Sequence, residues 1–351
     1  MATIVILGAG MMGTAFAWPL ADRGHSVRLV GTHLDADIVQ SIEHDRLHPK
    51  LKLTVPSAVV PYAVERLEEA LAGADAVALG VSSAGIRWAA EQLRGRLTPT
   101  LPLAMVSKGL EWDGDALHVL PDAFARACGE TSLSPVGVAG PCIAGELARR
   151  VPTSVVFTSR ALAQAKAWAE LARGPYYHVH CEEDVVGVEV CAALKNAYAM
   201  GMGFGAGLHA KNGGVTGSIA LHNYEAAVFA QSIWEMRQLI TELGGDPEQA
   251  SWLPGVGDLN VTCNGGRTGR FGHLLGSGLT PPEAIAQMQG ATLECLEILN
   301  TLRLALGHPA ALRGVRDALP LAQHLAEVAL DGAPIAMPFE RFFARRATAR
   351  R

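Results

Sequence analysis

The pattern of apolar and polar residues changes character near residue 184. Before it, short apolar runs, rich in β-branched residues, alternate with stretches in which apolar residues recur at helical spacing. The apolar runs cover residues 3–7, 27–30, 76–81, 102–106, 136–139 and 154–157, and the helical patterns include 63–71 and 87–97. This alternation predicts a parallel, doubly wound sheet that binds its ligand at the carboxyl ends of the strands.

Long helical patterns dominate the second half of the chain, where strand-like runs become scarce. Helices are expected at residues 188–202, 216–243, 282–306 and 313–330. A chain of 351 residues is long enough for two separate cores. The sequence therefore predicts an α/β protein with a Rossmann-type dinucleotide-binding domain over residues 1–183. A mostly α-helical substrate-binding and catalytic domain is expected over residues 184–351.

A glycine-rich turn follows the first apolar run. Gly8, Gly10 and Gly13 form the pattern G-x-G-x-x-G, with Met11 and Met12 before the last glycine. The first glycine permits a tight turn, the second lets a pyrophosphate approach the backbone, and the third lets the next helix pack on the sheet. The N–H groups at the start of that helix then face the anion. The turn predicts a dinucleotide cofactor.

The end of the second apolar run bears on the choice between NAD and NADP. An NAD-preferring site offers an acidic residue to the ribose 2′-hydroxyl about twenty residues beyond the glycine turn. Thr32 and His33 occupy the expected contact positions, and Asp35 follows slightly later. No arginine stands there to pair with the 2′-phosphate of NADP. The sequence favours NAD, with NADP tolerated.

Charge and composition exclude several classes of protein. The formal net charge is −5, so no basic surface for nucleic acid is indicated. Six scattered cysteines form no C-x-x-C pair, which favours reduced thiols over disulfides or a metal site. The apolar start is interrupted by glycines and lacks the basic residues of a signal peptide, and no stretch has the length of a membrane span. We expect a cytoplasmic protein without a metal, a nucleic-acid partner or membrane insertion.

Two adjacent polar residues, Lys195 and Asn196, interrupt the apolar helical stretch 193–201. Neither type is buried without a partner or a task. A lysine that faces a cofactor can hydrogen-bond a substrate oxygen and exchange a proton with it as hydride reaches the carbon. A lysine whose amine reaches water along the helix surface fits the same pattern.

A second group of polar residues lies further along the chain. Asp258 and Thr262 follow a glycine turn and stand four residues apart, so on a helix they share a face. The next segment, 265–272, is predicted to be a flexible basic loop. Its Arg267 and Arg270 suit a phosphate or carboxylate, because a guanidinium binds such groups through two hydrogen bonds. A solvated charged loop is the commoner use of such a segment.

In this order and spacing, these motifs resemble the family of NAD(P)-dependent glycerol-3-phosphate dehydrogenases over essentially the whole chain. Other segments that match the family's motifs are 80–83, 107–110, 140–148, 187–189 and 318–321. The resemblance implies an enzyme that interconverts dihydroxyacetone phosphate and sn-glycerol 3-phosphate by hydride transfer. It also implies a homodimer.

The same resemblance implies roles for individual residues. Lys195 would be the general acid and base, Lys108 would orient the substrate, and Asn196, Asp258 and Thr262 would bind the substrate or hold Lys195. Arg267 would take the substrate phosphate, and the other residues expected at the substrate are Gly140, Thr268 and Arg270. The residues expected at the cofactor are Gly8, Gly10, Met11, Met12, Gly13, Thr32, His33, Val81, Lys108, Ala144, Arg267 and Glu294.

Departures from the family pattern cluster at substrate recognition. The family's Ser-Arg-Asn triplet reads Gly266-Arg267-Thr268, the segment before it is short, and Cys142 replaces a serine. These differences leave open a dehydrogenase of another small phosphorylated or carboxylated hydroxy compound. A non-catalytic dinucleotide sensor is a second alternative, but it has no need of a proton-transfer lysine.

Overall fold

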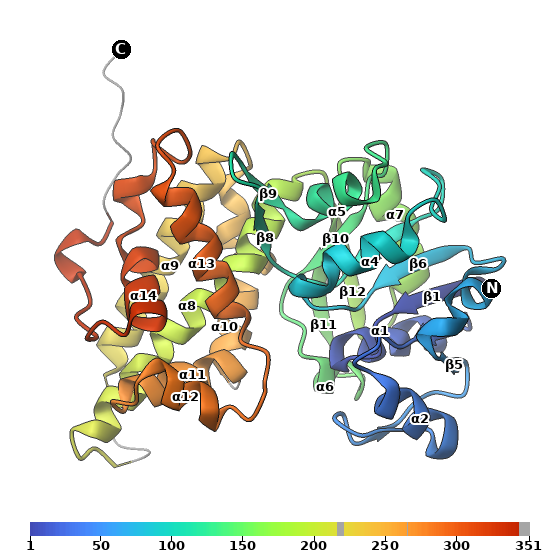
Figure 1. Cartoon of the computed structure of the whole chain (residues 1–351), viewed down its shortest axis with the longest axis horizontal. Coiled ribbons are helices and arrows are strands. Elements are labelled where there is room, and N and C mark those ends of the chain that lie inside the picture. The colour runs from blue at the N-terminus through green and yellow to red at the C-terminus, as the bar shows by residue number, and fades with distance from the viewer. Residues whose placement is uncertain (216–220, 265, 344–351) are drawn as a thin grey trace. The chain divides into compact units, whose positions relative to one another are not determined.

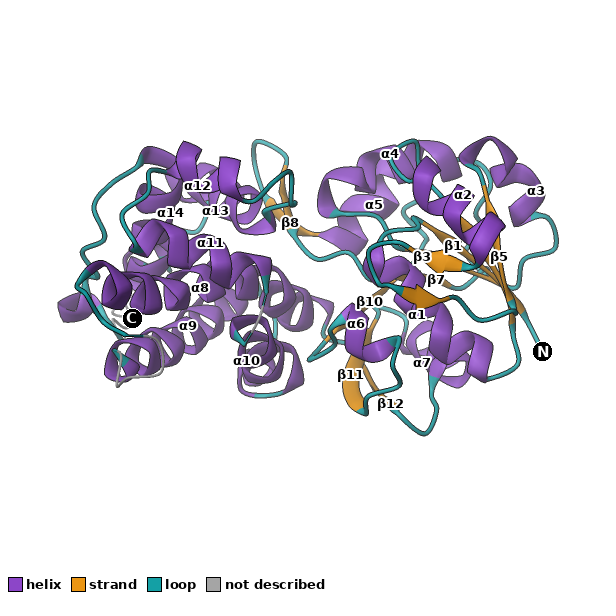
Figure 2. Ribbon diagram, turned by 90° about the horizontal axis from the view of Figure 1, so that it is seen from below, coloured by secondary structure: helices purple, strands orange, loops and turns teal. Residues whose placement is uncertain are grey.

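The computed structural model describes residues 1–215, 221–264 and 266–343, and the chain divides into two compact units (Figure 1). The first unit comprises Met1–Lys108 and Leu120–Val185, and the second comprises Gly109–Val119 and Val186–Arg351. The strands of the large sheet all belong to the first unit, whereas helices make up most of the second (Figure 2).

An eight-stranded sheet forms the centre of the first unit, in the order β12-β11-β10-β7-β6-β1-β2-β5. Its strands are β1 (Thr3–Leu7), β2 (Ser26–Val30), β5 (Val59–Tyr62), β6 (Ala76–Leu79), β7 (Leu103–Met105), β10 (Val136–Ala139), β11 (Thr153–Thr158) and β12 (Tyr177–Glu182). Strand β1 pairs in parallel with both β2 and β6, so the strand order reverses there. A ligand crevice is expected outside the carboxyl end of such a strand.

The sheet departs from the predicted parallel arrangement at one pair of strands. Strands β10 and β11 pair antiparallel, while the other strand pairs of the sheet are parallel. A parallel neighbour needs a crossover connection, which is usually a helix. The connection from β10 to β11 contains just the four-residue helix α6 (Ala144–Leu147), which does not provide one.

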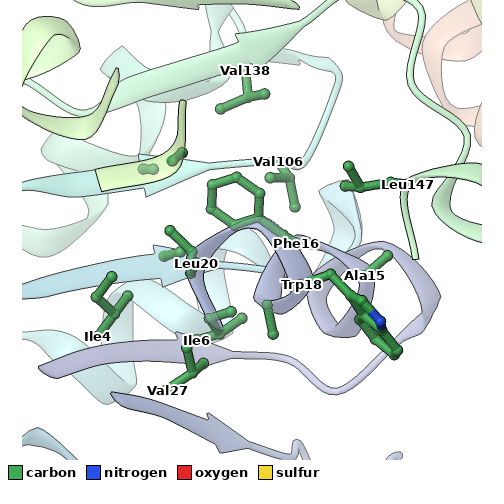
Figure 3. Close-up of a cluster of buried hydrophobic side chains, with 14 of the residues drawn as sticks. Ile4, Ile6, Ala15, Phe16, Trp18, Leu20, Val27, Val106, Val138 and Leu147 are labelled. Carbon is green, nitrogen blue, oxygen red and sulfur yellow. The ribbon is translucent and has the colours of Figure 1, made fainter. Parts of the chain in front are cut away.

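Apolar side chains cover both faces of the sheet, as a buried parallel sheet requires. Along β1, Ile4 and Ile6 join one buried cluster, while Val5 and Leu7 join another. Figure 3 shows Phe16, from the helix that follows β1, in the first cluster, and its ring centroid lies 5.9 Å from that of Trp168. The helices of this unit are α1 (Met11–Asp22), α2 (Ala36–Asp45), α3 (Leu67–Leu71), α4 (Ile86–Leu93), α5 (Leu120–Cys128), α6 and α7 (Leu162–Ala172).

Two small hairpins complete the strands. The first pairs β3 (Leu47–His48) with β4 (Leu53–Thr54). The second pairs β8 (Leu110–Trp112) with β9 (Leu117–Val119) and belongs to the second unit, where the ring of Trp112 lies 5.4 Å from that of His308.

The second unit contains long helices where the sequence predicts them, with three differences. Its helices are α8 (Val185–Lys211), α9 (His222–Glu242), α10 (Asp258–Cys263), α11 (Arg267–Gly276), α12 (Pro281–Gln287), α13 (Glu294–Gly307) and α14 (Pro320–Asp331). The single helix expected over 282–306 is two helices, separated by a segment in which Gly290 has a φ of +75°. The last helix starts at Pro320 rather than near 313, because proline suits the first turn of a helix.

The third difference concerns the segment expected to be a basic loop. Residues 267–276 form helix α11, so that expectation is wrong. Gly265 and the expected helical residues 216–220 lie outside the described part of the chain.

Short helical turns connect the longer elements, at Val64–Arg66, Ser83–Gly85, Pro247–Ser251, Leu253–Gly257, Arg316–Ala318 and Phe339–Arg341. None of the helices in the described ranges has both the length and the apolar content needed to cross a membrane.

Candidate functional site

Three glycines meet where the carboxyl ends of β1 and β6 reach helix α1. Gly8 has a φ of +113°, which favours glycine. A Cβ atom on Gly13 would lie 2.2 Å from the carbonyl oxygen of Gly8, and one on Gly80 would lie 2.6 Å from the Cα atom of Gly13. None of the three can carry a side chain, so the start of α1 lies directly against the sheet.

Gly10 is a different case from its neighbours. A Cβ atom there would meet just the carbonyl oxygen of Gly80 within 4 Å, at 3.9 Å. The packing of the protein therefore does not require a glycine at this position. Gly10 is the N-cap of α1, and Met11, 38% exposed, begins the helix. A glycine with free space at a helix N-terminus fits the close approach of a cofactor pyrophosphate.

Asp35 lies beside the glycine turn, although its position in the sequence is slightly late. Its Oδ2 atom accepts hydrogen bonds from the backbone N–H of Ala9 at 3.1 Å and from both the backbone N–H and the hydroxyl of Thr32 at 2.9 Å. The ring of His33 lies 5.7 Å from that of Trp88 on α4, in an edge contact. No local pattern in the sequence indicates this contact of Asp35, because the contact depends on how α2 begins.

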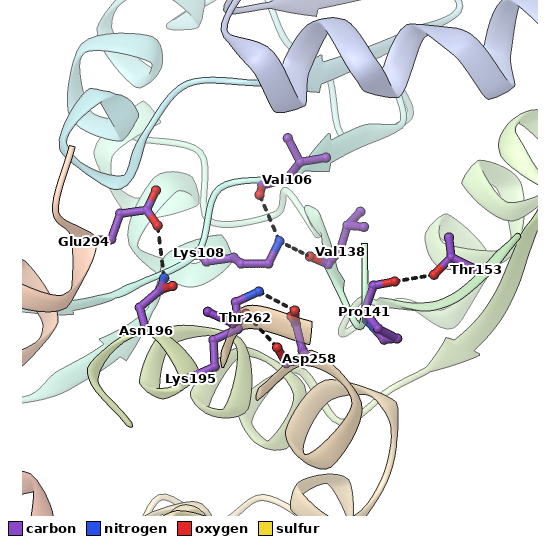
Figure 4. A network of polar contacts seen from close by, with 10 residues as sticks. All are labelled: Val106, Lys108, Val138, Pro141, Thr153, Lys195, Asn196, Asp258, Thr262 and Glu294. Carbon is purple, nitrogen blue, oxygen red and sulfur yellow. Dashed lines mark hydrogen bonds and ion pairs between the residues drawn. The ribbon is translucent and has the colours of Figure 1, made fainter. Parts of the chain in front are cut away.

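The other residues expected at the cofactor lie at or near the ends of neighbouring strands. Lys108 donates hydrogen bonds of 3.4 Å from Nζ to the carbonyl oxygens of Val106 and Val138, just beyond β7 and within β10 (Figure 4). Val81 follows β6, and its carbonyl oxygen accepts a hydrogen bond of 2.5 Å from Ser107.

Beyond β10, the chain turns sharply before it enters α6. Gly140 has a φ of +113°, and a Cβ atom on it would lie 3.1 Å from the Cα atom of Val155. The backbone of this turn is therefore specific to glycine. Thr153 donates a hydrogen bond to the carbonyl oxygen of Pro141, and Ala144 then begins α6 (Figure 4).

The second unit contains an ion pair between Lys195 on α8 and Asp258 at the start of α10 (Figure 4). Lys195 is 8% exposed and Asp258 is fully buried. The amine does not extend along the helix surface into water, so that alternative for Lys195 is wrong. A buried charge requires a partner, and each residue supplies one for the other.

Asp258 is held by an unusual local backbone. A single π-helical turn, Leu253–Gly257, leads directly into α10. Within it, a Cβ atom on Gly255 would lie 2.0 Å from the carbonyl oxygen of Ala250. Thr262 donates a hydrogen bond of 2.6 Å to the backbone carbonyl of Asp258, one turn earlier. Turns of this kind occur frequently at functional sites.

Glu294, the first residue of α13, joins two other expected site residues. Its Oε2 atom accepts a hydrogen bond of 3.0 Å from Nδ2 of Asn196, and its Oε1 atom lies 3.8 Å from Nη2 of Arg267. The side chain of Arg267 is 47% exposed, and it begins α11. Thr268 is buried, whereas Arg270 is exposed.

Glycines hold α11 directly against α8, which explains why the basic segment is helical. A Cβ atom on Gly203 would lie 2.3 Å from the carbonyl oxygen of Gly269, and one on Gly272 would lie 2.0 Å from that of Met200. The two helix backbones are in direct contact. This packing fixes the position of Arg267 relative to Lys195 within the second unit.

The structure thus links Lys195 with Asp258, and Asn196 with Arg267 through Glu294, all within the second unit. In the residues that the structure describes, no group of three or more His, Cys, Asp or Glu side chains could hold a metal ion.

Two sequence models of one family match most of the chain. The model for the N-terminus of NAD-dependent glycerol-3-phosphate dehydrogenase matches residues 3–165, and the model for its C-terminus matches residues 184–338.

Individual relatives agree with this match. The chain is 37% identical to an NADP(+)-dependent glycerol-3-phosphate dehydrogenase of Archaeoglobus fulgidus, over 86% of this chain and 88% of the relative. It is 30% identical to a glycerol-3-phosphate dehydrogenase [NAD(P)+] of Bacillus pumilus, over 98% and 95%. The crystal structure of glycerol-3-phosphate dehydrogenase from Coxiella burnetii superimposes with a TM-score of 0.80 at 26% identity, covering 97% of each chain.

Proposed function

Because the chain belongs to the NAD-dependent glycerol-3-phosphate dehydrogenase family, we propose that Lys195 exchanges the proton in its reaction. The chain is an NAD(P)-dependent oxidoreductase that interconverts dihydroxyacetone phosphate and sn-glycerol 3-phosphate. The bound nicotinamide supplies the hydride in one direction and accepts it in the other. A side chain must therefore deliver or remove one proton at the substrate oxygen.

The buried ion pair of Lys195 with Asp258 is the observation that carries this proposal. The carboxylate fixes the position of the amine and compensates its charge inside the protein. In reduction, the ammonium of Lys195 donates its proton to the oxygen of the former carbonyl. In oxidation, the neutral amine takes the proton of the hydroxyl. Asn196 and Thr262 support this arrangement, since Asn196 neighbours Lys195 and Thr262 anchors the backbone of Asp258.

We propose that Arg267 binds the substrate phosphate. Its guanidinium is half exposed at the start of the ten-residue helix α11, where an anion is favoured. Glu294 restrains the guanidinium at 3.8 Å and itself contacts Asn196. Gly140, Lys108, Thr268 and the exposed Arg270 complete the proposed substrate residues.

On the cofactor side, we propose contacts to the residues of the glycine turn and the neighbouring strand ends. These are Gly8, Gly10, Met11, Met12, Gly13, Thr32, His33, Val81, Lys108 and Ala144, with Arg267 and Glu294 from the second unit. We propose a preference for NAD with NADP tolerated, because residues 32–35 hold no arginine for a 2′-phosphate. We further propose a cytoplasmic homodimer, with residues 1–183 as the cofactor domain and 184–351 as the catalytic domain, on the family resemblance.

The experiment is an assay of NADH oxidation with a panel of ketone phosphates, for the wild type and Lys195→Ala. We expect the wild type to reduce dihydroxyacetone phosphate. The variant should lose about two to four powers of ten in turnover, which is typical of a positioned acid–base group. NADH affinity, measured by fluorescence, should change little. Wild-type turnover in Lys195→Ala would remove this residue from the mechanism, whereas preference for another ketone would change the substrate and leave the lysine in place.

A further inference from the structure

Three side chains hold the central residue of the glycine turn from two sides. The carbonyl oxygen of Ala9 accepts a hydrogen bond of 3.0 Å from the hydroxyl of Thr14 and one of 3.1 Å from Nε2 of His48. The N–H of Ala9 donates to Asp35 at 3.1 Å. A carbonyl oxygen has two lone pairs, so the two donors fill its capacity. Thr14 and His48 are both fully buried.

The hydrogen bonds of His48 assign its tautomer. The backbone N–H of Leu51 donates to Nδ1 at 3.1 Å, so Nδ1 carries a lone pair and the ring proton is on Nε2. Burial lowers the pKa of His48, which favours the neutral ring. The hairpin β3–β4 holds the ring in place, with the N–H of Lys52 donating to the carbonyl oxygen of His48 at 2.8 Å.

The orientation of the Ala9 carbonyl determines the orientation of the next N–H group. In a planar trans peptide, the C=O of one residue and the N–H of the next point in opposite directions. His48 and Thr14 draw the carbonyl of Ala9 toward buried side chains. The N–H of Gly10 therefore points away from them, at the N-cap of α1.

We propose that His48 is a positioning residue for the dinucleotide, which presets the N–H of Gly10 toward the cofactor pyrophosphate before the cofactor binds. This inference rests on the proposed cofactor site and extends it to a residue outside the glycine motif, 39 positions beyond Ala9. A donor group already oriented in the free protein spares the ordering cost that binding would otherwise carry. His48 does not touch the cofactor and acts through the Ala9–Gly10 peptide.

Two substitutions separate positioning from simple packing. His48→Leu fills similar space without a donor or an acceptor. His48→Gln keeps both, because its amide nitrogen can donate to Ala9 while its oxygen accepts from Leu51. His44→Leu, at an exposed histidine of α2 in the same unit, is the matched control. Dissociation constants for NADH, ADP-ribose and adenosine would be measured by calorimetry, together with denaturant unfolding of each variant.

We expect His48→Leu to weaken NADH and ADP-ribose by about five- to tenfold, as the loss of one neutral hydrogen bond implies. Adenosine has no phosphate, so its affinity should stay within about twofold of the wild type if the effect is confined to the Gly10 N–H. His48→Gln and His44→Leu should bind all three like the wild type. Thr14→Val should likewise weaken NADH and ADP-ribose but not adenosine, and Thr14→Ser, which keeps the hydroxyl, should bind all three like the wild type.

The proposal is overturned if His48→Leu weakens adenosine as much as ADP-ribose, or if neither affinity changes. It is also overturned if His48→Gln behaves like His48→Leu, since the role would then be to fill space under the hairpin. Should His48→Leu fail to fold, the His48→Gln and Thr14 variants give the same decision. Because no substrate is used, failure of these tests is distinct from failure of the Lys195 assignment, and an inability of the wild type to bind NADH would refute the cofactor site itself.

Discussion

The two units hold their candidate site residues in place by different means. In the first, close backbone contacts shape the glycine turn, because Gly8, Gly13 and Gly80 lie too close together for any side chain. In the second, the proposed site residues include charged side chains inside the protein, with Lys195 and Asp258 as the buried pair. A close-packed glycine turn tolerates no added side-chain atoms, whereas a buried ion pair requires both of its charged partners. Substitutions in the two units should therefore change stability, cofactor binding and activity in different combinations.

The largest effect is expected from separating the buried ion pair. Asp258→Leu removes the buried carboxylate that pairs with the amine of Lys195, so the free energy of unfolding should fall by about 3–5 kcal/mol. The double variant Lys195→Met with Asp258→Leu should recover most of that stability but no activity, because an apolar pair can replace a buried ion pair. Urea unfolding and the NADH assay would be read on the same samples. If the double variant were as unstable as Asp258→Leu, the pair would not be the source of the loss.

A smaller effect is expected at Arg267, which is half exposed. Arg267→Ala should raise the KM for dihydroxyacetone phosphate by about ten- to a hundredfold, since a charge-assisted hydrogen bond contributes about 1.5–3 kcal/mol. Activity on unphosphorylated dihydroxyacetone should hardly change. Arg267→Lys should recover part of the affinity, because a point charge lacks the planar geometry of the guanidinium.

Arg270→Ala is the matched control on the same helix. An effect equal to that of Arg267→Ala would transfer the phosphate contact to Arg270. Unchanged kinetics in both variants would remove the phosphate contact from α11.

The glycines of the first unit provide the next test. Gly13→Ala brings a Cβ atom to 2.2 Å from the carbonyl oxygen of Gly8, so it should destabilise the protein by about 1–3 kcal/mol. A Cβ atom on Gly10 would meet just one protein atom within 4 Å, so Gly10→Val should lose less stability than Gly13→Ala, while NADH binding is lost. Calorimetry and thermal unfolding measure the two properties separately. Unchanged NADH binding in Gly10→Val would contradict the cofactor assignment of this turn.

The same contrast explains which features the sequence predicts. The strand at residues 3–7 and the glycine turn after it are both recognisable from local patterns. The structure has β1 at residues 3–7. The expected basic loop is instead α11, because Gly269 and Gly272 serve a contact with α8 that no local pattern records. In a loop, glycine permits unusual backbone angles, whereas between two helices it permits close contact of the backbones. The local sequence does not distinguish these two cases.

Contacts between residues far apart in the chain are the features that the sequence predicts least well. Lys195 and Asp258 are each recognisable as polar residues in apolar surroundings, but their pairing spans 63 positions. Neither Asp35 nor His48 carries a local signal for its contact with Ala9, because both contacts depend on how separate elements return to the glycine turn. The sequence indicates which residue types need partners, and tertiary packing decides the partners.

The smallest predicted effect concerns a second buried charge of the helical unit, Glu235 on α9. Its carboxylate is fully buried and accepts hydrogen bonds from Gln231, from Tyr198 and from the backbone N–H groups of Leu321 and Ala322 at the start of α14. Burial raises the pKa of Glu235 to about 7 from its ordinary value of 4.5, despite these donors. The folded protein therefore holds more protons than the unfolded chain between these two values.

A group that binds its proton more tightly when folded stabilises the protein at low pH, and this stabilisation is lost as the pH rises from 4.5 to about 7. Glu235→Gln does not titrate and cannot satisfy all four donors, so it should be less stable than the wild type throughout. The difference in unfolding free energy between the two proteins should shrink as the pH is raised from about 5 to about 8. Glu170→Gln, at an exposed glutamate, should show no such change. A difference that widened with pH would mean that the four donors outweigh burial and that the helical unit holds Glu235 as a permanent anion.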